Sequence, residues 1–321
     1  MSASAAAASR IGRLTGLAVR DARVVGSQHG YQHLMVTLSG GRRAFVKAVS
    51  ADVRDQRAVP SDSDPGLAGT DAALQVAAAF AAEANGLRWL AEAGAVPVPE
   101  VLAVSPSALV ISMITPGRAT PEAAFGFGAD LARLHAAGAD GFGAPWPGFI
   151  ASLPLPNDGP AAGEGTAGEG AGAWPAWYAD RRLLPYLRRA ADAGTLGPAH
   201  IRPVEAVVAR IADLAGPAEP PSRIHGDCWS GNVLWSGARG WLIDPAAHGG
   251  HRETDLAMLA LFGVPFLDRI LASYHEAVPL AAGWRARVPL HQLHPLLVHA
   301  CLFGAGYAGP VAEAARAALA A

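Results

Sequence analysis

Hydrophobic positions in the first 115 residues follow the short period of β-strands. Alternating or uniformly apolar runs, separated by Gly and Pro, predict five strands at 19–25, 33–38, 43–49, 96–104 and 109–114. A long Ala-rich segment at 71–93 instead carries apolar residues three and four positions apart, which is typical of a helix, and Gly94 is expected just beyond its end. The Ala/Ser-rich start of the chain, 1–9, is expected to be a loose terminus.

Beyond Pro116 the hydrophobic pattern becomes helical. Helices are predicted at 123–137, 174–192 and 200–215, and more helices follow toward the C-terminus. Two segments rich in Gly, Pro, Ala or charged residues, 51–70 and 159–172, are expected to be mobile loops. The pattern predicts an α+β chain with a small β-rich lobe at 1–115, built from the five strands and one helix, and a larger, mainly helical lobe at 116–321.

An acid–amide–acid set lies in the second lobe. Asn232 follows Asp227 by five residues, and Asp244 comes twelve residues later. The apolar runs 233–235 and 241–243, joined by the turn-rich residues 236–240, predict a β-hairpin. Asn232 would enter the first strand and Asp244 would leave the second, so the two should meet at the open end of the hairpin.

The residue types in this set point to phosphoryl transfer. Oxygen ligands such as Asn232 and Asp244 suit Mg²⁺, and Asp227 could accept the proton of an attacking hydroxyl. Kinase-like enzymes place a base and two magnesium ligands with this spacing, so a two-lobed protein kinase-like fold is predicted. The alternative is that all three are ordinary turn residues.

A phosphoryl-transfer site also needs a cation for the ATP phosphates. Lys47 ends the strand-like run Ala44-Phe-Val-Lys47, and Glu83 lies in the apolar stripe of the 71–93 helix, where it needs a partner. We predict that Lys47 and Glu83 pair; the alternative is an exposed lysine and a solvated glutamate. The backbone of Ser112 and Ile114, at the expected hinge between the lobes, is predicted to contact adenine.

Composition narrows the class of protein. The chain has 321 residues, half of them hydrophobic, with a formal net charge of −2 and two cysteines. A near-neutral charge does not favour a nucleic-acid or membrane partner, and no run of about 18 apolar residues predicts a membrane span. We expect a cytoplasmic protein. The oligomeric state is left open, with a monomer favoured.

Together these motifs resemble the fructosamine kinase (ketosamine 3-kinase) family, within the aminoglycoside phosphotransferase-like, protein kinase-like superfamily. The resemblance rests on His225-Gly-Asp-Cys-Trp-Ser-Gly-Asn232, Leu242-Ile-Asp-Pro245 and Gly249-Gly-His-Arg-Glu-Thr-Asp-Leu-Ala-Met258. It implies that Asp227 is the catalytic base, that Asn232 and Asp244 hold Mg²⁺, and that Lys47, steadied by Glu83, holds ATP.

The resemblance also implies a substrate. The family phosphorylates the sugar 3-hydroxyl of ketosamines, free or on glycated lysines of proteins, and this step leads to deglycation. Trp229, His251 and His291 are placed on the substrate side by the same resemblance; the alternative for Trp229 is packing under the catalytic loop. By the same resemblance, Asp255 is expected to brace the catalytic loop, which contains residues 225–232; the alternative is that it caps the start of the following helix.

Alternatives remain open at this stage. A related kinase for aminoglycosides, choline or another metabolite would use the same motif, and a pseudokinase would use the fold for binding alone. His291 and His294 could share a helix face and hold zinc. This is disfavoured because no neighbouring Cys or carboxylate pattern completes a site and Pro295 is expected to break the helix.

Overall fold

The computed structural model describes residues 3–28, 31–49, 69–158 and 172–321. The predicted loops at 51–70 and 159–172 therefore lie outside the described residues, apart from their last one or two positions.

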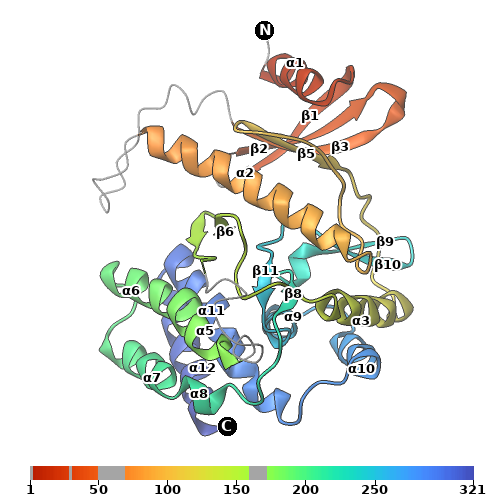
Figure 1. Ribbon diagram of the computed structural model, residues 1–321. Coiled ribbons are helices and arrows are strands. Elements are labelled where there is room, and N and C mark those ends of the chain that lie inside the picture. The colour runs from red at the N-terminus through yellow and green to blue at the C-terminus, as the bar shows by residue number, and fades with distance from the viewer. Residues whose placement is uncertain (1–2, 29–30, 50–68, 159–171) are drawn as a thin grey trace.

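A five-stranded antiparallel sheet forms the N-terminal part of the chain, in the order β1-β2-β3-β5-β4 (Figure 1). Its strands are β1 (Val19–Gln28), β2 (Tyr31–Leu38), β3 (Arg43–Val49), β4 (Val101–Ser105) and β5 (Ala108–Ser112). Five strands lie where five were predicted, but the strand predicted at 96–104 begins only at Val101. Along β2, the buried residues Leu34, Val36 and Leu38 alternate with partly exposed ones, which is the period-two pattern that predicted the strand.

The sheet is covered by a helix on each face (Figure 1). Helix α2 (Gly69–Glu92) packs Phe80 and Leu87 against β5, and Gly94 beyond it has a positive φ, as predicted. Helix α1 (Ala3–Thr15) was not predicted, and the expectation of a loose terminus was wrong. Its residues Ala7 and Ile11, one turn apart, are buried against the other face of the sheet.

The rest of the chain is mainly helical, which confirms the α+β class. The helices are α3 (Pro121–Ala136), α5 (Trp174–Tyr178), α6 (Leu184–Asp192), α7 (Pro198–Ala209), α8 (Ile211–Leu214), α9 (Glu253–Phe262), α10 (Leu267–Ala277), α11 (Trp284–Phe303) and α12 (Ala308–Ala320). A π-helical turn, Ala179–Leu183, joins α5 to α6. Thr120 begins α3, where its hydroxyl accepts a hydrogen bond from the backbone N–H of Ala123.

Three short strand pairs interrupt these helices. They are β6 (Gly148–Ile150) with β7 (Leu153–Leu155), β8 (Ser222–Ile224) with β11 (His248–Gly250), and β9 (Val233–Ser236) with β10 (Arg239–Leu242). The β8–β11 and β9–β10 pairs flank the acid–amide–acid set. In Figure 1 the β8–β11 pair lies below α2 and the β9–β10 pair lies beside the C-terminal end of α2.

Helix α11 continues through both Pro289 and Pro295, so the prediction that Pro295 breaks this helix was wrong. The buried residues Leu290, Leu293 and Leu297 lie on both sides of the proline. Packing of this apolar face outweighs the backbone hydrogen bond that a proline removes.

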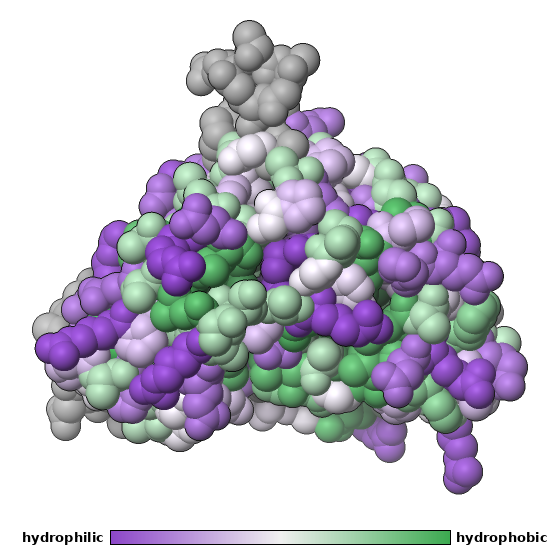
Figure 2. Space-filling view, turned by 90° about the horizontal axis from the view of Figure 1, so that it is seen from below, coloured by the Kyte–Doolittle hydropathy of each residue, from purple (hydrophilic) through white to green (hydrophobic). Residues whose placement is uncertain are grey.

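Within the described residues, no helix is long and apolar enough to cross a membrane. The face seen from below, which is formed by the helical part, mixes hydrophilic and hydrophobic side chains (Figure 2).

Candidate active site

The β9–β10 hairpin brings the ends of the acid–amide–acid set together. Val233 pairs with Leu242, and the backbone N–H of Ile243 donates to the carbonyl of Asn232 at 3.0 Å. The hairpin was predicted, but its connection is shorter than the five residues expected. Ser236 pairs with Arg239, which leaves a two-residue turn that begins at Gly237 with φ +60°.

Asp227 lies on the loop between β8 and β9. The Asn232 side-chain amide donates to both the backbone carbonyl and the carboxylate of Asp227, at 2.9 Å each. Burial raises the pKa of Asp227 to about 7, aided by the charges of Asp244 and Asp255 and opposed by the Asn232 hydrogen bond and Lys47. A carboxylate with a pKa near 7 is well matched to accept a proton at neutral pH.

Asp255 holds the loop that carries Asp227 through hydrogen bonds to its backbone. Its fully buried carboxylate accepts hydrogen bonds from the backbone N–H of His225 at 2.7 Å and of Gly226 at 2.9 Å, and it contacts His135 Nε2 at 3.2 Å. Burial alone would raise the pKa of Asp255, but the His135 hydrogen bond and nearby donors outweigh it and lower the pKa. The carboxylate therefore stays ionised, and the predicted brace is confirmed.

Lys47 on β3 reaches two carboxylates. Its Nζ lies 2.7 Å from Glu83 on α2 and 3.0 Å from Asp244. The predicted Lys47–Glu83 pair is therefore present. Burial raises the pKa of Glu83 to about 6, with Asp244 adding to the shift and Lys47 opposing it. The ion pair links the sheet, α2 and the end of the β9–β10 hairpin across the gap between the two parts of the chain.

These side chains share one cavity of about 680 Å³. Its wall includes Lys47, Glu83, Asp227, Asn232 and Asp244, as well as residues of α2 and of the β6–β7 hairpin. Another part of the wall is mainly apolar and comes from the loop between β8 and β9, α9, α11 and the segment that follows α11. One cavity therefore joins a charged region to an apolar one, which suits a polar reaction on an organic acceptor.

An aromatic group forms this second region: Trp229, Phe262, His299, Phe303 and Tyr307. We call it the aromatic wall. The rings of Phe262 and His299 stack with centroids 4.6 Å apart, and Trp229 meets Phe262 edge-on at 6.1 Å. Trp229 was predicted on the substrate side. The other four were missed, although the spacing of four residues between His299 and Phe303, at the end of α11, was a signal for one helical face.

His299 has a defined hydrogen-bonding state within this wall. Its Nδ1 lies 2.7 Å from the carbonyl of Pro295, so Nδ1 carries the proton and donates. Burial lowers the pKa of His299, which keeps the ring neutral at neutral pH. Its Nε2 is therefore an acceptor in a wall that is otherwise apolar.

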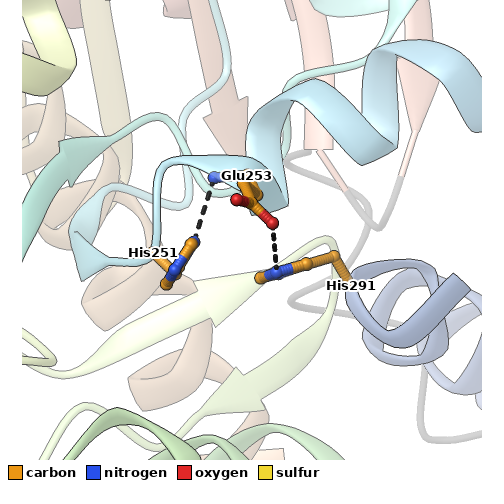
Figure 3. Close-up of side chains that lie close together, drawn as sticks. All are labelled: His251, Glu253 and His291. Carbon is orange, nitrogen blue, oxygen red and sulfur yellow. Dashed lines mark hydrogen bonds and ion pairs between the residues drawn. The ribbon is translucent and has the colours of Figure 1, made fainter. Parts of the chain in front are cut away.

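His251 and His291, which were predicted on the substrate side, lie outside the wall of this cavity. Both are buried in the helical core, at 3% and 0% exposure, and neither is part of the cavity wall. They gather around Glu253 (Figure 3), whose carboxylate lies 3.4 Å from His291 Nε2 and whose backbone N–H donates to His251. Trp174 packs against both histidine rings.

A carboxylate does therefore lie beside His291, contrary to the sequence-based expectation. The ligand atoms of His251, Glu253 and His291 lie within 4.8 Å of one another, a spacing that a metal ion could use. Arg287, however, donates to both Glu253 oxygens, at 2.6 and 2.9 Å. Because a guanidinium already neutralises the carboxylate, we interpret the group as a buried hydrogen-bonded network.

The predicted adenine contacts are not part of the cavity wall described above. The backbone N–H of Ser112 donates to the carbonyl of Glu100 at 2.8 Å, and its hydroxyl accepts from the Glu100 N–H at 2.9 Å. The carbonyl of Ser112 and the backbone of Ile114 remain predictions as adenine contacts.

Comparison with known proteins supports a family assignment. Residues 70–321 match the family model described as fructosamine kinase. The chain belongs to the fructosamine kinase family. It is 38% identical over 231 residues to a probable ketoamine kinase of Thermus thermophilus, which covers 72% of this chain and 79% of the relative. Mouse ketosamine-3-kinase is 33% identical over 141 residues, 42% of this chain and 44% of its own.

Solved structures agree with this assignment. A candidate fructosamine-3-kinase of Thermobifida fusca shares 47% identity with this chain, with a TM-score of 0.84 and 98% of each chain covered. The aminoglycoside phosphotransferase APH(2'')-Ib is 13% identical with a TM-score of 0.59, covering 96% of this chain and 97% of its own, which shows the shared fold alone. The chain is thus a phosphotransferase enzyme with a protein kinase-like fold.

Proposed function

We propose that this fructosamine kinase family member transfers the γ-phosphoryl group of ATP to the sugar 3-hydroxyl of ketosamines of the fructosamine or ribulosamine type. The observation that carries the proposal is that one cavity holds Asp227 together with the Lys47–Asp244 cluster and the aromatic wall. A base between a phosphate-binding region and an apolar acceptor region suits transfer from a nucleotide to an organic alcohol.

The charged region fits MgATP. Asn232 uses its amide nitrogen on Asp227, which turns its carbonyl oxygen away from that carboxylate, and the Asp244 side chain is 42% exposed. One carboxylate and one amide oxygen, completed by phosphate oxygens and water, are a typical magnesium environment. Bound Mg²⁺ would neutralise charge on the phosphates. Lys47 would hold phosphate oxygens, while Ser112 and Ile114 would contact adenine.

The aromatic wall fits the acceptor. A ketosamine carries an amine that is largely protonated at neutral pH, and the exposed face of Trp229 could bind that cation. The unprotonated Nε2 of His299 could accept a hydrogen bond from a sugar hydroxyl or from the ammonium group. Asp227 would then orient the attacking hydroxyl and accept its proton.

The wall favours a ketosamine over an aminoglycoside. The carboxylates that line the cavity in the described residues are Glu83, Asp227 and Asp244, and all three belong to the phosphoryl-transfer group. A polycationic aminoglycoside would need further acids to bind. A pseudokinase is disfavoured because Lys47, Asp227, Asn232 and Asp244 are all present and close together. We further propose that the reaction serves deglycation of free or protein-bound ketosamines in the cytoplasm.

A substrate panel tests this proposal. Purified protein is incubated with MgATP and, separately, ribuloselysine, fructoselysine, a glycated protein, kanamycin and choline, and phosphate transfer is followed by ³¹P NMR and mass spectrometry. We expect phosphorylation of ketosamines at the 3-hydroxyl. Transfer to kanamycin or choline alone would overturn the substrate assignment and leave the phosphotransferase assignment intact.

A further inference from the structure

A second, much smaller cavity lies behind the catalytic loop. It measures about 10 Å³, which is room for one particle close to the size of a water molecule. Its wall includes Trp174 and Trp177 of α5, Arg182 of the π-helical turn, His248 of β11 and His294 of α11. Gly226 lines it too, directly before Asp227 in the chain. None of these wall residues belongs to the phosphoryl-transfer group.

Three residues of this wall carry buried donors without acceptors. Trp174 Nε1, Trp177 Nε1 and Arg182 Nε are N–H groups that can only donate, and none has a hydrogen-bond partner among the described residues. The three side chains are at most 5% exposed, so bulk water does not satisfy them. His294 Nε2 also lacks a partner and becomes a fourth donor when it carries the ring proton. Such groups are normally paired when buried.

Arg182 adds a positive charge that the described residues do not balance. Its other nitrogens donate to neutral oxygens, the carbonyls of Pro156 and Arg181 and the side chain of Asn157. Its guanidinium lies 4.3 Å from the centre of the Trp177 ring. Asp158, which follows Asn157, pairs with Arg181 toward the surface, and Asp180, two residues before Arg182, is exposed. Burial lowers the pKa of Arg182 to about 9, which still leaves it protonated at neutral pH.

Size and charge together select the ligand. The buried cation and the three unpaired N–H donors disfavour a metal ion and favour an anion, while His248, which donates its Nδ1 proton to the Ala246 carbonyl, adds one acceptor nitrogen to the wall. About 10 Å³ is too small for phosphate, sulfate or a carboxylate. One water molecule accepts only two hydrogen bonds and carries no charge, so it leaves a donor and the charge of Arg182 unmatched.

We propose that this cavity binds a monovalent anion of halide size, chloride under cellular conditions, held by Arg182, Trp174 and Trp177. The ion packs against Gly226, whose φ is +78° and whose hypothetical Cβ would lie 2.3 Å from the Ala246 carbonyl. An ion packed against Gly226, one residue before Asp227, helps to hold the catalytic loop in place. This site is separate from the MgATP and acceptor regions and does not depend on the proposed substrate.

Two measurements test for the ion. Crystals of the full chain grown with bromide in place of chloride should show an anomalous peak between Trp174, Trp177 and Arg182. In solution, sodium chloride should raise the melting temperature along a saturable curve, relative to sodium gluconate at equal ionic strength. A water molecule at this position, without an anomalous peak, would overturn the proposal. A bromide peak without a saturable rise in melting temperature at about 0.15 M chloride would mean an adventitious ion only. That outcome would also overturn the proposal.

Two matched variants test which residues bind the chloride ion. Trp177→Phe keeps the ring beneath Arg182 and removes one N–H, so chloride affinity should fall about tenfold. Arg181→Gln is the control, because it also removes one positive charge but at the neighbouring residue, which points toward the surface. Its chloride affinity should stay within about twofold of that of the parent protein. Equal chloride affinity in Trp177→Phe and the parent would contradict the assigned donors, even if Arg182→Gln fails to fold.

Discussion

The two regions of the main cavity are built on different principles. The phosphoryl-transfer region is a set of close ion pairs and charge-assisted hydrogen bonds, in which Lys47 joins Glu83 and Asp244. The aromatic wall is held by ring packing, and Phe303 and Trp229 remain 63% and 39% exposed. Charge development in a phosphoryl-transfer transition state requires groups fixed in advance, whereas an apolar wall needs only a suitable shape and can accept related substrates.

Asp227 is expected to give the largest effect, because it belongs to the fixed region. Asp227→Asn should lower kcat by about 10²- to 10⁴-fold and leave ATP affinity nearly unchanged. Turnover and nucleotide binding would be measured by coupled assay and calorimetry. Asp213→Asn, a change at an exposed acid on α8, serves as the control and should retain parental activity. Parental turnover in Asp227→Asn would remove Asp227 from the mechanism.

A substitution of Lys47 should show how much the ion pairs of the charged region contribute to the stability of the protein. Lys47→Met leaves Glu83 buried without its cation and should lower the free energy of unfolding by about 3–5 kcal/mol, measured by urea denaturation. The double variant Lys47→Met/Glu83→Leu should recover part of this loss. Arg42→Met, which breaks the exposed Arg42–Glu100 pair, should cost about 1 kcal/mol or less. A double variant no more stable than Lys47→Met would contradict this interpretation.

Activity should follow the ionisation of Asp227. Its pKa of about 7 predicts that kcat/KM rises about tenfold per pH unit below that value and levels off above it. The profile would be measured from about pH 5.5 to about pH 8, a range that includes this pKa. A flat profile over that range would contradict the role of Asp227 as base.

The same raised pKa has a consequence for folding. The folded protein binds this proton more tightly than the unfolded chain does. The resulting stabilisation is fully present below the unfolded pKa of Asp and is lost as the pH rises through 7. Asp227→Asn should therefore gain stability relative to the parent protein as the pH increases, which denaturation at several pH values would measure.

The aromatic wall should give the smallest and most selective effect. Trp229→Ala should raise the KM for a ketosamine about tenfold, because it removes the ring face offered to the amine, and should leave the KM for ATP unchanged. Phe125→Ala changes a comparably exposed aromatic residue outside the cavity wall and should alter neither constant. An equal rise in both KM values for Trp229→Ala would mean that the two regions are not independent.

Features that depend on neighbours in the sequence were predicted well. The β9–β10 hairpin, the five strands of the sheet and the position of Gly94 all follow from local periodicity and turn chemistry. Glu83 was paired correctly with Lys47 because a carboxylate in an apolar helical stripe must find a cation. In each case the evidence lay within a few residues, or in a charge that burial makes costly.

Features that depend on distant packing were missed or wrong. Helix α1 forms because Ala7 and Ile11 find an uncovered face of the sheet, although the segment itself has a weak pattern. His251 and His291 looked available for substrate, but Trp174 and Glu253 enclose them in the core. The contribution of His299 to the aromatic wall depends on how α11 lies beside the catalytic loop, and no local signal gives that distance.

The sequence by itself determined the reaction class, because acids and amides at set spacings on a hairpin must meet at its open end, and such a group suits phosphoryl transfer. Tertiary structure alone decided what surrounds that chemistry: which aromatic rings face the acceptor, which histidines are buried, and where Arg182 meets unpaired indole N–H groups. Those outcomes depend on contacts between segments far apart in the chain, whose relative positions are decided by packing of the whole core and not by any local pattern.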